Sequence, residues 1–201
     1  GEPLSWTVND IGTISSFGVL VTDTTTGRVY PVDIAGVTTT TDFLDLTPGH
    51  GFTVAPLTGD DVRDLFAVQA LLAGELAARA ADNGTEAELR ELEALHLELT
   101  AAARRGDTTG LEEKNHQFHR TVNRMARSRK VQWALSLVVR YVPREFYGSI
   151  PGWPEATTAD HEALLDALRA ADAAGARNAM RAHIAHAGEL LAQHFDRRTS
   201  S

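Results

Sequence analysis

The sequence predicts a mainly α-helical protein: an antiparallel bundle of six to seven helices, preceded by a small β-rich N-terminal segment. The composition changes near residue 57, from Thr, Val and Gly to the helix formers Ala, Leu, Glu and Arg. After that point apolar residues recur at helical spacing, and capping residues alternate with glycine and proline stops. The connections between the predicted helices are short, which favours antiparallel neighbours.

Composition excludes several classes of protein. The chain has 201 residues, of which 43% are hydrophobic and 23% are charged, so it can bury a core and is not a disordered protein. It contains no cysteine, which excludes a disulfide scaffold, a thiolate metal site and a cysteine nucleophile. No apolar run reaches the roughly 18 residues that span a bilayer. We expect a cytoplasmic protein that does not bind membranes.

Residues 1–57 form the predicted β-rich segment. The runs 17–23 and 28–33 flank a glycine-containing turn and predict one hairpin, and a second is expected from 42–46 to 52–55. The segment carries one basic residue, Arg28, against six acidic residues. Such a segment repels phosphate, so we do not expect it to bind DNA.

Residues 58–196 form the predicted all-α bundle, and residues 197–201 form a tail. Thr58 can cap the first helix, and Thr85 and Glu88 have the spacing of a capping box. Thr158 is expected to cap the fifth helix, and Gly175 to separate it from the last. The expected helices cover about 58–81, 85–106, 109–127 and 129–142, then begin near 158 and after 175, the last reaching about 195.

Polar side chains interrupt the apolar faces of three of these helices. Asn115 and His119 lie four residues apart on the apolar face of the third helix, so they point to the same place. His161 comes one turn before the leucines of the fifth helix, and His183 lies among the apolar residues of the last helix. Helix bundles build metal sites from such facing side chains. Imidazole nitrogen and amide oxygen suit Zn, Ni, Mn or Fe(II).

The periodicity alone leaves a second interpretation open, because each of these histidines could be a hydrogen-bonded core residue. His96 also lies near an apolar face, but no further ligand type is spaced beside it. His116 lies off the apolar face of the third helix, and we expect it in solvent. His186 follows His183 by one turn and is expected at the surface.

Four stretches resemble the C-terminal effector domain, or FCD domain, of FadR-type GntR regulators, in the branch that binds a metal. They are 61–66 (DVRDLF), 115–120 (NHQFHR), 160–168 (DHEALLDAL) and 179–183 (AMRAH). The family's ligand pattern is Asp or Asn, His four residues later, and two further His on later helices. The resemblance covers about two-thirds of the chain. It implies that Asn115, His119, His161 and His183 bind one divalent metal, with Zn first and Ni, Mn or Fe as alternatives.

The resemblance also implies a homodimer and a small organic acid as ligand. Three neutral imidazoles and an amide leave the metal's charge unbalanced, so its open positions should favour a carboxylate. Where the family often carries an inward Arg and, four residues on, a Glu, this chain has Gln69 and Ala73. Candidate ligand-binding residues are Gln69, Arg140 and Tyr141. The fourth helix is apolar on more than one face, as expected of a helix that is central in the bundle or shared with a partner.

The family places a winged helix-turn-helix ahead of the effector domain. Residues 47–57 resemble the end of its wing, but residues 1–46 do not resemble its helices, so the module is expected to be missing or degenerate. Two functions stay open: a metal-dependent sensor of a small carboxylate, and a metalloenzyme that reuses the same site on a carboxylate-containing substrate. A purely structural dimer module is a third hypothesis. The sequence identifies no catalytic residue.

Overall fold

The computed structural model describes residues 18–22, 29–33, 44–47, 51–54, 58–139, 147 and 150–199. The chain divides into two compact units, Gly1–Pro56 and Leu57–Ser201, and each is described by itself.

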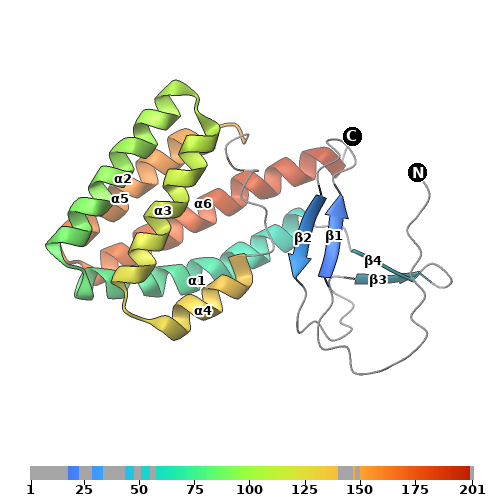
Figure 1. Ribbon diagram of the computed structural model, residues 1–201, viewed down its shortest axis with the longest axis horizontal. Helices are drawn as coiled ribbons and strands as arrows, with labels where there is room; N and C mark the ends of the chain where they lie inside the picture. Colours follow the sequence, from blue (N-terminus) through green and yellow to red (C-terminus); the bar gives the residue numbers. More distant parts are fainter. Residues whose placement is uncertain are drawn as a thin grey trace. The chain divides into compact units, whose positions relative to one another are not determined.

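The first unit contains two antiparallel strand pairs. β1 (Gly18–Thr22) pairs with β2 (Val29–Asp33), and β3 (Leu44–Thr47) pairs with β4 (Gly51–Val54) (Figure 1). These strands lie in the segments where the two hairpins are predicted. The rest of residues 1–57 lies outside the described residues. The β-rich character of the whole segment and the missing helix-turn-helix therefore stay predictions.

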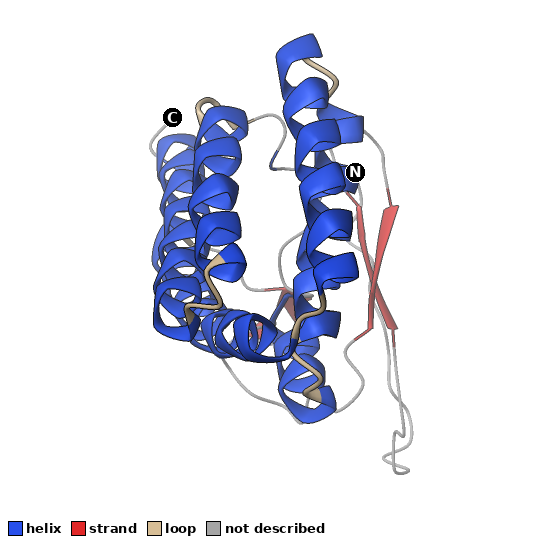
Figure 2. Cartoon of the chain, turned by 90° about the vertical axis from the view of Figure 1, so that its left-hand side faces the viewer, coloured by secondary structure: helices blue, strands red, loops and turns tan. Residues whose placement is uncertain are grey.

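The second unit is helical, which confirms the predicted mainly α-helical class. Its helices run side by side (Figure 2), and short connections join them except between the fourth and the fifth. No helix in the described part of the chain is long and apolar enough to cross a membrane. The helices are α1 (Gly59–Asn83), α2 (Glu86–Arg105), α3 (Thr108–Met125), α4 (Arg129–Val138), α5 (Trp153–Arg169) and α6 (Ala173–Thr199).

Reciprocal capping fixes where the first two helices begin. The Thr58 hydroxyl accepts the Asp61 backbone N–H at 3.1 Å, and the Asp61 carboxylate accepts the Thr58 backbone N–H at 2.8 Å. Thr85 and Glu88 repeat this arrangement at the start of α2. Each pair satisfies backbone donors that a helix start leaves without partners.

Two predicted helix starts are wrong. α5 begins at Trp153 rather than at Thr158, because Pro154 occupies its first turn and the Thr158 hydroxyl donates to the Pro154 carbonyl inside the helix. Gly175 lies within α6 rather than before it, since Asp172 accepts the Gly175 backbone N–H and starts the helix two residues earlier. Residues 140–146, where the fourth helix was predicted to end, lie outside the described residues.

The long helices α1 and α6 run antiparallel and side by side (Figure 1). Arg63, in the first turns of α1, contacts the carboxylates of Glu189 and Asp196 near the end of α6 at 2.9 and 3.0 Å. A Cβ atom added at Gly188 would lie 2.5 Å from the Cβ of Phe66, which is closer than real Cβ atoms approach. Glycine at this position therefore allows the two helices to approach closely.

Two apolar clusters make up the core of the bundle. One contains Phe118 and Leu164, and the other contains Phe66 and Trp153. Along α5, His161 separates Trp153 of the second cluster from Leu164 of the first. Along α6, His183 follows the first cluster and precedes the second in the same way. The inward histidines therefore occupy a polar layer between two apolar clusters.

We predict that Gly188→Ala destabilises the bundle. Alanine should gain about 1 kcal/mol in helix propensity, but overpacking typically costs about 1–3 kcal/mol and sometimes more. Because the new Cβ meets Phe66 at 2.5 Å, we expect the overpacking to dominate. Chemical denaturation measures the free energy of unfolding. Ala185→Ser, at an exposed position on the same helix, should change it by less than about 0.5 kcal/mol. Unchanged or increased stability of the Gly188 variant would contradict the close approach.

Candidate metal centre

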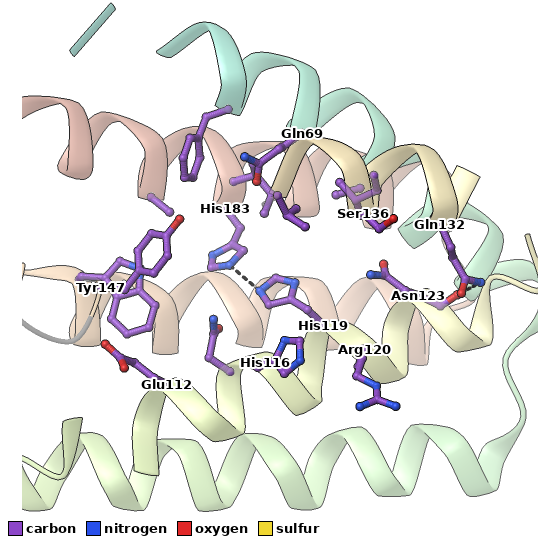
Figure 3. Close-up of a pocket in the computed structure, with 18 residues that line it drawn as sticks. Gln69, Glu112, His116, His119, Arg120, Asn123, Gln132, Ser136, Tyr147 and His183 are labelled. Carbon is purple, nitrogen blue, oxygen red and sulfur yellow. Dashed lines mark hydrogen bonds between the residues drawn. The ribbon is translucent and has the colours of Figure 1, made fainter. Parts of the chain in front are cut away.

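Three imidazoles from three helices meet inside the bundle. His119 comes from α3, His161 from α5 and His183 from α6, and one ring nitrogen of each lies within 4.8 Å of the others. His161 and His183 are buried, whereas His119 is partly exposed and lines a cavity together with His183 (Figure 3). The structure therefore brings together the three histidines that the sequence singled out.

The nitrogens of His119 and His183 face each other directly. Their Nε2 atoms are 3.1 Å apart, and their rings are stacked at 18°. Two nitrogens that bind one ion through bonds of about 2.1 Å can lie at this separation. Without an ion, one nitrogen must donate a proton to the other. The contact suits both a metal-free and a metal-bound state.

Asp160 orients the His183 ring. Its Oδ2 atom lies 3.3 Å from Nδ1 of His183 and 3.2 Å from Nδ1 of the half-exposed His186. A proton assigned to Nδ1 of His183 leaves the Nε2 lone pair directed at His119. Burial alone would raise the pKa of Asp160, but the hydrogen bond and charge of His183, with a contribution from His186, lower it below its ordinary value. Asp160 is therefore a carboxylate at neutral pH and can accept both protons.

His161 is held by packing rather than by hydrogen bonds. Its ring stacks on Phe118 with centroids 4.0 Å apart at 11°, and neither ring nitrogen has a partner among the described residues. Burial, followed by the neighbouring His183, His119 and His96, lowers the pKa of His161 well below its ordinary value. Burial likewise lowers the pKa of His119. Both rings are therefore neutral at pH 7, which is the form that binds metals.

The donor atoms of this cluster fit a divalent metal of the zinc type. Asn115, one turn before His119 on α3, has a buried Oδ1 atom without a partner among the described residues. A buried acceptor without a partner is costly, and so is the buried ring of His161. An ion bound between them would satisfy both. Nitrogen and neutral oxygen donors without thiolates are compatible with Zn, Ni, Mn or Fe(II).

The cluster borders a cavity of about 310 Å³, a size suited to a small organic molecule. Gln69 of α1 lines it, as does Ala73 one turn later. The other two candidate ligand-binding residues, Arg140 and Tyr141, lie outside the described residues. Residues of α3, α4 and α6 form further parts of the wall. The side chains of Phe66, Tyr147 and Trp153 give it an aromatic surface.

Some residues near the site were missed or misplaced by the sequence interpretation. His116 was expected in solvent, but it lines the cavity and is only partly exposed. His96, which the sequence left without a partner, is buried with its ring 6.2 Å from that of His161, and its Nε2 lies 2.9 Å from a Glu162 oxygen. Asp160 was overlooked because it is adjacent to His161 in sequence. Only the packing of α5 on α6 brings it to His183.

Comparison with known protein families assigns the bundle. The FCD domain matches residues 64–186, more than half of the chain, and this match includes all four predicted ligands. The chain belongs to the FCD domain family. A search of curated protein sequences found no match.

Solved structures share the fold of this FCD chain. E. coli McbR/YncC is similar with a TM-score of 0.64 and 22% identity, over 77% of this chain and 79% of that one. A GntR-family transcriptional regulator from Pseudomonas syringae has a TM-score of 0.60 and 16% identity, over 79% and 66%. Streptococcus agalactiae GntR has a TM-score of 0.53 and 20% identity, over 71% and 72%. At these identities the similarity establishes the fold of GntR-family regulators.

Proposed function

We propose that this FCD domain is the metal-dependent sensor of a GntR-type regulator, and that it binds a small carboxylate at one divalent ion. Asn115, His119, His161 and His183 would hold the ion, with Zn as the first candidate. The observation that carries the proposal is the cluster of three inward imidazoles, two of which, His119 and His183, line a cavity. A purely structural core would have no need to place two of the three beside a cavity.

The electrostatics of the cluster support an anionic ligand. Four neutral donors would leave the two positive charges of the ion uncompensated, and the buried surroundings would strengthen their attraction for an anion. The Asp160 carboxylate contacts the far side of His183 and offsets only part of this charge. A ligand carboxylate entering from the cavity would supply the remainder. The ion would act as the binding point for that carboxylate.

We predict one bound divalent ion per chain, whose affinity depends on Asp160. Asp160→Asn should weaken metal binding by about 10–100-fold, because the amide orients His183 and raises its basicity less well than the carboxylate. Titration against a chromophoric chelator measures the affinity. Asp166→Asn is the control, since Asp166 is an exposed carboxylate on the same helix that pairs with Arg169.

Elemental analysis tests whether the chain binds an ion at all. Protein that holds no ion by elemental analysis, both as purified and after incubation with Zn, Ni, Mn or Fe(II) near neutral pH, would contradict the metal prediction. Metal binding that survives His119→Ala undiminished would contradict the assignment of the ligands, because Nε2 of His119 faces the centre of the cluster.

We predict that small carboxylates bind the metal-loaded protein and bind the metal-free protein much more weakly. Calorimetry with 2-hydroxycarboxylates, with and without a chelator, measures the difference. A sensor should return the ligand unchanged, as checked by mass spectrometry after long incubation. Conversion of the ligand at many turnovers per chain would instead support the metalloenzyme. Equal binding with and without metal would contradict both.

We infer that the exposed apolar side chains of α1 and α4 form the surface of a homodimer. Leu71 of α1 is 55% exposed, and Trp133 and Leu137 of α4 are 62% and 42% exposed. These two helices pack against each other, so we infer that the side chains contribute to one face of the bundle. Within the described part of the bundle α4 buries only Leu135, which leaves most of its apolar surface available to a partner.

We predict that Leu137→Glu converts the dimer to a monomer. A carboxylate at the centre of an apolar interface would be buried without a counter-charge. Sedimentation velocity over a range of concentrations measures the oligomeric state. Leu97→Glu is a matched control, because Leu97 is 70% exposed on α2, away from this face. A wild-type chain that sediments as a monomer at all concentrations would contradict the inference.

A further inference from the structure

A buried amide from α1 faces the proposed ligand site without a partner. Gln69 is only 5% exposed, and its Nε2 atom has no hydrogen-bond partner among the described residues. Figure 3 shows its side chain extending from α1 toward the cavity that contains His119 and His183. A buried donor without a partner costs free energy comparable to a lost hydrogen bond, unless a ligand supplies the acceptor.

A second neutral donor lines the same cavity. Trp153, at the start of α5, is 2% exposed, and its indole N–H also has no partner among the described residues. Tyr147 packs against this indole with ring centroids 5.4 Å apart, and burial raises the pKa of its hydroxyl, which keeps it neutral. Among the described residues, this side of the cavity therefore offers neutral donors and aromatic surface, but no cation.

The charged side chains of the described wall lie elsewhere. Arg120 is exposed, and in Figure 3 its guanidinium points away from the His119–His183 pair. Glu112 lies on the Tyr147 side and brings a negative charge to the cavity. His116 and the neutral Tyr147 are the remaining titratable groups on the described wall outside the metal cluster. Near Gln69 the described wall therefore offers a second ligand carboxylate a neutral donor but no counter-charge.

We propose that Gln69 makes the site selective for monocarboxylates whose uncharged remainder carries a hydrogen-bond acceptor, and that it excludes dicarboxylates. This inference rests on the proposed function, because the first carboxylate is assigned to the metal. Gln69 donates to the carbonyl, amide or hydroxyl oxygen of the remainder. Discrimination of this kind is strong where a site has buried polar groups that only the correct ligand satisfies.

Calorimetry of the metal-loaded full chain tests the inference with two isosteric probes. Malate and its 4-amide have the same number of heavy atoms and the same 2-hydroxycarboxylate end, and they differ in one charge. We expect the 4-amide to bind at least about tenfold tighter than malate, because it gains one hydrogen bond and avoids burying one charge. Malate binding equally or more tightly would overturn the inference.

Two substitutions at Gln69 assign the selectivity to this residue. Gln69→Arg supplies a cation and should reverse the preference toward malate. Gln69→Leu removes the donor and should weaken binding of the 4-amide about tenfold. It should leave the affinity for 2-hydroxybutyrate, which has no distal acceptor, unchanged. Helical circular dichroism and metal content show that each variant is folded. An unchanged malate-to-amide ratio in both variants would overturn the role of Gln69.

Arg120→Gln is the matched control for the exposed cation. It should leave the preference for the 4-amide unchanged. Loss of the preference would assign the selectivity to Arg120 rather than to Gln69. Failure of the proposed function gives a different result. If none of the three probes binds better to metal-loaded than to metal-free protein, the carboxylate is not held by the metal. If they bind better but malate is preferred, only the selectivity inference fails.

Discussion

Three inward imidazoles, of which His161 and His183 are buried, share one small volume and impose the main constraint on this bundle. Charged rings would lose hydration and repel one another, and so His119 and His161 have lowered pKa values. Neutral rings still need partners for their nitrogens. Asp160 satisfies His183, but His161 has only the stacked ring of Phe118. The core is divided into two apolar clusters around this layer, and a metal ion would complete it.

The described part of the cavity wall on the α1 side is also uncharged. The α1 side contributes the amide of Gln69 where a cation would make the wall attract a second anion. Its partnerless donor and that of Trp153 resemble the unsatisfied atoms of the metal cluster, since both are buried polar groups that nothing within the described chain completes. The structure therefore contains two adjacent sets of incomplete contacts. One set suits a cation, and the other suits a neutral acceptor.

Helical periodicity predicted the inward histidines because burial follows the apolar face of each helix, and the faces of α3, α5 and α6 are well marked. The capping residue Thr58 and the capping-box spacing of Thr85 and Glu88 predicted the starts of α1 and α2. The corresponding prediction was wrong for α5, where Pro154 starts the helix before a second possible cap. Asp160 and His116 could not be predicted in their roles, because each depends on how one helix packs against another. No single-helix pattern contains that information.

The slight burial of α4 has a consequence for regulation. One face of this helix lines the cavity with Gln132 and Leu135, while Trp133 projects from the exposed face. A ten-residue helix that buries a single side chain among the described residues has few contacts to keep it in place. By contrast, α1 and α6 pack closely at Gly188. Displacement of α4 by a ligand would therefore reposition the outer apolar face as well. Ligand affinity and subunit association would then be thermodynamically linked, each altering the other by the same factor.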